Sequence, residues 1–230
     1  MKFFIPTKKL QKAFLVAILL LLILNILSIF LAINHDQNNS LGSFLILLFD
    51  FNQEANIPSL FSTLQFLVAS LLLLIIALFK KSNGKKHWGW LGISLLFFLL
   101  MLDEAASIHE FLFTFLQEKY HNSTLFYYIS LLVFGLVLVG MALIYIPFFN
   151  HLNKRLLTGM LLSMGIFLLG AIVFESIGKN VFDTYGLSFG YRLIYTIEET
   201  LEMLGLAIFI NVLNWYIGIK MQKISIVLTV

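Results

Sequence analysis

Four ionisable side chains interrupt an otherwise strongly apolar stretch of the chain, FLLMLDEAASIHEFLFTF (98–115). They are Asp103, Glu104, His109 and Glu110. An ionisable group near the middle of a membrane helix costs roughly 2.5–3.5 kcal/mol on insertion scales, so this concentration calls for an explanation. The stretch predicts one part of an enclosed polar site.

Two further apolar stretches carry acids that could join this site. One contains Glu175, and the other contains Glu198, Glu199 and Glu202. A helix rises about 1.5 Å per residue, so these acids and Asp103 lie about 22–33 Å from the basic ends of their helices. They therefore fall in one layer. Because Glu202 lies four residues after Glu198 and three after Glu199, all three point roughly to one side of a helix. We therefore expect the three helices to direct carboxylates into a common pocket.

Carboxylates with an imidazole are ligands for hard to borderline cations, so we expect one or two divalent metal ions, Fe, Mn or Zn. The expected metal ligands are Asp103, Glu104, His109, Glu110, Glu175, Glu199 and Glu202. Bundles with carboxylate-bridged metal pairs use Glu-x-x-His motifs, and here position 106 is Ala, so the match to that template is partial. His121 could reach the site from a loop. The expected catalytic groups are Glu110, His109 and Glu198, which could transfer protons.

Two cations near these acids suit structural ion pairs. Lys179 lies four residues after Glu175, and Arg192 lies seven before Glu199, so we expect these two pairings. The remaining acids must then be protonated, reached by water, or compensated by bound metal.

The elements that position these residues are membrane helices. The chain has 230 residues, of which 60% are hydrophobic and 12% charged, more apolar surface than a water-soluble domain could enclose. We expect an all-α integral membrane protein, residues 1–230 forming one polytopic domain with a bundle of six transmembrane helices. The expected spans are 11–33, 59–79, 88–116, 124–146, 156–178 and 192–217. A short interfacial or re-entrant helix is expected between the first two, over SFLILLFDF (43–51).

Charge predicts the orientation of these spans. Short basic clusters at 2–12, 80–86, 154–155 and 220–223 all fall on one side, so the positive-inside rule makes both termini cytoplasmic. All acids then fall toward the outer side. A bacterial inner (plasma) membrane is the expected location, with membrane lipids as partners and no nucleic acid, since topology accounts for the basic clusters. The sequence does not indicate an oligomeric state.

Three functions fit this pattern. The first is a membrane-embedded metalloenzyme acting on a lipid-like or quinone-like substrate. The second is a proton-coupled or cation transporter, which also needs carboxylates in the membrane, although the inner halves of the helices carry no charge. The third is a non-catalytic membrane subunit whose acids bind a partner. Whether the protein is an enzyme is left open by the sequence.

Overall fold

Every regular element of the computed structural model is helical over the part it describes, residues 7–34, 40–108, 111, 115 and 123–220. The helices, in chain order, are α1 (Thr7–Asn34), α2 (Ser40–Phe49), α3 (Ile57–Ser82), α4 (Trp88–Ala106), α6 (Ser123–Phe149), α7 (Lys154–Leu168), the π-helix η1 (Leu169–Phe174), α8 (Glu175–Tyr185) and α9 (Phe189–Lys220). The expected all-α class is therefore confirmed for these residues.

Within the described residues, five helices are long and apolar enough to cross a membrane. They are α1, α3, α4, the continuous run Lys154–Tyr185 formed by α7, η1 and α8, and α9. In α6, the described apolar part is the shorter helix Gly135–Phe149. Five of the six expected spans are thus confirmed by length and composition.

The third expected span, 88–116, is wrong in its outer part. Helix α4 ends at Ala106, because Ser107 has φ 50° and a left-handed backbone that a regular α-helix cannot contain. The backbone is helical again at Ile108, Phe111 and Phe115. The break at Ser107 lies three residues after Glu104, so the polar stretch is not one straight helix.

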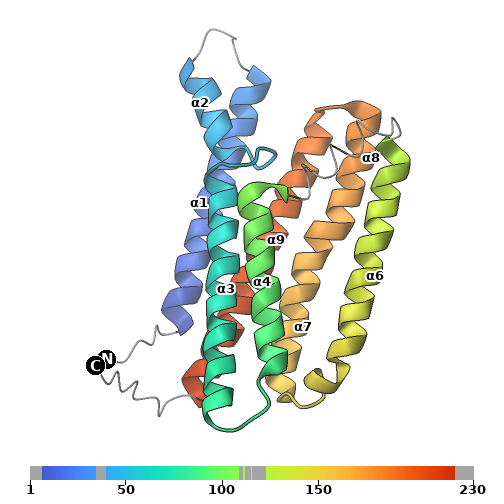
Figure 1. The fold of residues 1–230 in the computed structure, drawn as a ribbon. Coiled ribbons are helices and arrows are strands. Elements are labelled where there is room, and N and C mark those ends of the chain that lie inside the picture. The colour runs from blue at the N-terminus through green and yellow to red at the C-terminus, as the bar shows by residue number, and fades with distance from the viewer. Residues whose placement is uncertain (1–6, 35–39, 109–110, 112–114, 116–122, 221–230) are drawn as a thin grey trace.

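Helix α9 is the central element of the bundle. It packs against α1, α3, α7, η1 and α8, and α4 is attached mainly through α3 (Figure 1). The core is aromatic and aliphatic, and within it the rings of Phe97 and Phe209 stack with centroids 4.8 Å apart. Trp90 and Tyr216 stack in the same way at 5.7 Å. These fully packed rings fill the half of the bundle nearest the C-terminal end of α9.

The two ends of the bundle differ in charge. The start of α1, the α3–α4 and α6–α7 connections and the end of α9 lie at one end (Figure 1), which carries Lys8, Lys9, Lys12, Lys80, Lys81, Lys85, Lys86, Lys154, Arg155 and Lys220. We call this the basic end. The opposite end, with α2, the end of α4 and the α8–α9 turn, carries the acids of the described chain and is called the acidic end.

Local sequence explains several boundaries. Asn56 caps α3 in a reciprocal capping box with Ser59, and Pro58 stands in the first turn, where its missing N–H costs nothing. Gly186, with φ 60°, ends α8 and turns the chain into α9. Gly89 and Gly92 in α4 leave room for the side chains of Phe148 and Tyr145, which attach the basic end of α6.

Candidate functional site

The acids of α9 lie on its side toward α8, η1 and α4. Glu198, Glu199 and Glu202 are each half-buried. The carboxylate of Glu202 is repelled by four other carboxylates, those of Glu199, Glu198, Glu104 and Glu175. Three separate elements, α4, α8 and α9, thus bring acidic groups within electrostatic range of one side chain. We call these five residues the Glu202 group.

Glycines allow the helices that carry the Glu202 group to approach closely. A Cβ added to Gly170 in η1 would lie 2.7 Å from the backbone oxygen of Glu198 and 3.0 Å from Cγ of Glu202. One added to Gly178 in α8 would lie 3.3 Å from Cγ2 of Ile194 and 3.8 Å from Oε2 of Glu198. Small residues at such contacts are what membrane helices use for close packing. The Glu198 side chain therefore lies against the glycine-lined side of η1 and α8.

The outer edge of the Glu202 group is more open than its centre. Glu175 is exposed, and Glu104 is half-buried near the end of α4. Both residues make further interactions with the protein. A molecule in the surroundings of the bundle could therefore approach this edge without crossing the core.

The expectation of one or two Fe, Mn or Zn ions is wrong. Among the residues that the structure describes, no three His, Asp or Glu side chains are arranged to hold a metal ion. Metal ligands must converge on one point from about 2.0–2.6 Å, whereas carboxylates repel one another over a longer range. The acids of the Glu202 group can therefore repel one another without forming a set of metal ligands.

Several expected site residues are not placed by the structure. His109, Glu110 and His121 lie outside the described residues. Asp103 is half-buried in the last turn of α4. We expected Asp103 and Glu110 to lie on the same side of one helix. That expectation needs an uninterrupted α-helix, and the left-handed backbone of Ser107 interrupts it.

The two cations at the acidic end have different partners from those expected. Lys179 forms an ion pair with Asp183, one turn further along α8, where the sequence favoured Glu175. Arg192 of α9 pairs with Asp50, whose Oδ2 is 3.8 Å from Nη1, where the sequence favoured Glu199. Asp50 is buried and Arg192 nearly so, which makes this pair part of the interior.

A buried polar network that sequence reasoning missed lies beside this ion pair. Asn25, fully buried in α1, donates from Nδ2 to Oγ1 of Thr196 on α9 at 2.9 Å and accepts from the backbone N–H of Phe51 at 2.9 Å. Asn56 in turn donates from Nδ2 to the backbone oxygen of Asp50 at 2.7 Å. The network joins α1, the α2–α3 connection and α9. A single amide within the apolar run of α1 was the sequence signal for it.

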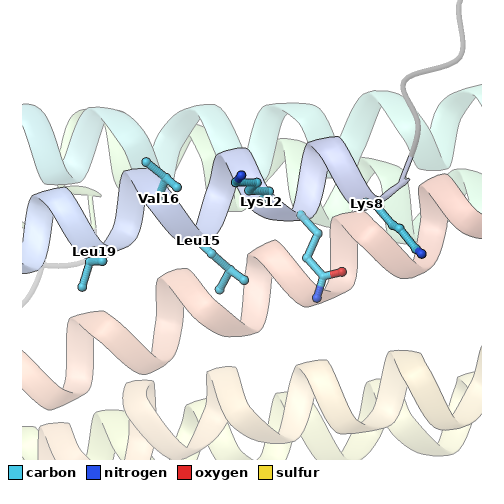
Figure 2. Close-up of a pocket in the computed structure, with 6 residues that line it drawn as sticks. Lys8, Lys12, Leu15, Val16 and Leu19 are labelled. Atoms are coloured by element: carbon cyan, nitrogen blue, oxygen red, sulfur yellow. The ribbon is translucent and has the colours of Figure 1, made fainter.

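Two shallow surface depressions lie away from the Glu202 group. A shallow groove runs along α1 at the basic end and is lined by Lys8, Gln11, Lys12, Leu15, Val16 and Leu19 (Figure 2). A second depression shares Lys12 and Val16. Neither includes a member of the Glu202 group, so the acids mark the chemically distinctive region and the grooves do not.

Comparison with known proteins gives a family and no function. No curated protein and no solved structure was found to match the chain. A family model matches residues 13–216. This range covers, in whole or in large part, every described helix that is long and apolar enough to cross a membrane. The chain belongs to this family, which is described as a domain of unknown function (DUF8692).

Proposed function

We propose that this protein is a membrane-embedded acid–base protein in which the Glu202 group holds and exchanges protons for a lipid-like or quinone-like molecule at the acidic end. The observation that carries the proposal is the repulsion of Glu202 by Glu104, Glu175, Glu198 and Glu199. Carboxylates that repel one another in a membrane interior do not all stay ionised, so the carboxyl groups share protons as a unit.

The acid–base role follows from the interaction of the acids with one another. Lys179 and Arg192 pair with Asp183 and Asp50, neither of which belongs to the Glu202 group. Carboxyl groups that interact with one another can pass a proton between them, which is what acid–base chemistry needs. The exposed Glu175 supplies the point of contact with the surroundings.

The orientation belongs to the same proposal. We infer that the basic end is cytoplasmic, that α6 is the sixth span, and that α2 lies in or near the outer interface. The acidic end is then external. Protons and the lipid-like molecule would reach the Glu202 group from the outer leaflet or the outer solution.

Infrared spectroscopy of the protein in lipid nanodiscs tests proton sharing. The band of protonated carboxyl groups should change with pH in the wild type, and Glu202→Gln should alter the titration of the carboxyls that remain, because their shared charge changes. Asp183→Asn is the matched control, since Asp183 is an exposed acid paired with Lys179. Identical effects of the two variants would contradict the proposal.

A second measurement addresses the molecule that exchanges protons. A benzoquinone with a short alkyl tail, added to the nanodiscs, should shift the same carboxyl band, while an alkane of equal length should not. Glu202→Gln should reduce the quinone effect. An equal response to quinone and alkane would contradict the proposal that the Glu202 group exchanges protons with a quinone-like molecule.

Proton-coupled transport is the competing function, because carboxylates inside membranes also serve transporters. The packing of the basic half disfavours it: Trp90, Phe97, Phe209 and Leu213 are almost completely buried there. Liposomes containing the protein and an internal pH-sensitive dye distinguish the two functions. A Glu202-dependent change of internal pH would favour transport, and an unchanged internal pH would favour a site that exchanges protons on one side.

A further inference from the structure

The helix that carries Glu175 is not regular, and the irregularity lies directly before Glu175. Six residues, Leu169–Phe174, form the π-helix η1 between α7 and α8. A π turn bonds i to i+5, so it contains one residue more than an α turn. Insertions of this kind change the direction in which every later side chain points.

The size of this change follows from helix geometry. In an uninterrupted α-helix at about 100° per residue, Glu175 would point about 140° away from Gly170, five positions earlier. If the π turn of η1 contains one extra residue, Glu175 points only about 40° away from Gly170. Gly170 faces α9, where an added Cβ would meet the backbone oxygen of Glu198.

The glycines of the same helix provide an independent check. Gly159 and Gly170 are eleven positions apart, which places them about 20° apart in a regular helix, and both contact α9. In a regular α-helix, Gly178 and Gly170 would differ by about 80° in direction around the helix axis. If η1 contains one extra residue, they differ by about 20°. In the structure Gly178 does contact α9, at Ile194. The observed contacts therefore agree with one extra residue in η1.

We propose that η1 is the positioning element of the Glu202 group, turning Glu175 of α8 toward Glu198 and Glu202 of α9. This inference rests on the proposed function for its chemical meaning, although its geometry stands separately. The interactions of Glu175 with Glu198 and with Glu202 agree with it. Glu175 is thus a proton-sharing residue because of a helix irregularity that no sequence periodicity would show.

Disulfide cross-linking in membranes tests the geometry. The chain contains no cysteine, so pairs can be introduced without removing native thiols. Ile194→Cys should cross-link more readily with Gly178→Cys than with Ile177→Cys, and Glu198→Cys more readily with Glu175→Cys than with Phe174→Cys. A regular α-helix would reverse both preferences, because it directs 177 and 174 toward α9. Reversed or equal yields within either matched pair would overturn the inference.

A second measurement separates this inference from the proposed function. Glu175→Gln should change the infrared titration of the remaining carboxyls, whereas Ser176→Ala, at the next position, should leave it unchanged. If the cross-links form as expected and Glu175→Gln has no effect, the role of η1 in placing residue 175 survives and proton sharing fails. If Glu175→Gln acts but the cross-links follow the α-helical pattern, the positioning role of η1 is wrong.

Discussion

Asn25 is a single amide enclosed among apolar side chains, and its two hydrogen bonds join three parts of the fold. We predict that Asn25→Ala lowers the free energy of unfolding by about 1–3 kcal/mol, because it leaves the buried N–H of Phe51 and the hydroxyl of Thr196 short of a partner. Unfolding in detergent, followed by circular dichroism, measures this loss.

Asn34 provides the matched control for Asn25. It lies on the same helix, but it is exposed, and its side chain donates to the backbone oxygen of Phe30 one turn earlier. Asn34→Ala should change the free energy of unfolding by less than about 0.5 kcal/mol. Similar losses in the two variants would show that the interhelical bonds of Asn25 contribute little.

The Asp50–Arg192 pair should behave as a coupled unit. Asp50→Asn and Arg192→Gln should each cost about 1–3 kcal/mol of unfolding free energy, because each leaves a mostly buried charge without its partner. The double variant should cost less than the sum of the two. Strict additivity in the thermal unfolding of the four proteins would mean that the 3.8 Å pair has no stabilising interaction.

Individual residues show where sequence reasoning stops. Helical spacing assigned Arg192 to Glu199, but spacing considers only neighbours on one helix. The actual partner, Asp50, belongs to the α2–α3 connection, and only the packing of α1, α3 and α9 brings it near. Helical depth predicted that the acids share one layer, but a metal ligand set needs interatomic distances that depth does not determine, and the described residues form no such set.

At the scale of elements, the contact of α7 with α9 depends on Gly205. A Cβ at this position would lie 2.7 Å from the backbone nitrogen of Phe167 and 2.9 Å from its Cα, atoms that cannot move independently of α7. We predict that Gly205→Ala costs about 1–3 kcal/mol of unfolding free energy through overpacking. Thermal unfolding and cross-linking of α7 to α9 would both report the separation of the helices.

Gly165 is the control for Gly205. It lies in α7 and an added Cβ would meet nothing within 4 Å. Gly165→Ala should leave the free energy of unfolding unchanged or raise it by up to about 1 kcal/mol, because alanine is the better helix former. Equal destabilisation by both substitutions would indicate a general effect of glycine replacement.

The elements themselves were largely predictable, and their irregularities were not. Apolar runs of sufficient length give the long helices, since only a helix satisfies its own backbone bonds in a membrane. Neither hydropathy nor residue spacing indicates the left-handed Ser107 or the π-helix at 169–174. Both irregularities border acidic residues, so they change the direction of the side chains on which the function depends.

At the scale of the whole molecule, charge is distributed unequally between the two ends. The basic end is attached to the aromatic core, since Lys80 lies over the ring of Tyr216 at 5.8 Å and Arg155 over that of Trp215 at 4.6 Å. Aromatic and basic residues together are typical of the cytoplasmic interface of a membrane protein. The acidic end is therefore the one expected to face outward.

Reporter fusions test this orientation. If the chain has the six spans and the orientation that we propose, a reporter fused after Val230 should report a cytoplasmic location and one inserted at Asn122 an external location, because three spans would then lie on either side of residue 122. Replacing Lys80, Lys81, Lys85 and Lys86 with Gln should weaken this preference, since basic residues favour a cytoplasmic location of short connections. If the insertion at Asn122 reports cytoplasmic, the Glu202 group faces the cytoplasm and exchanges protons with that compartment.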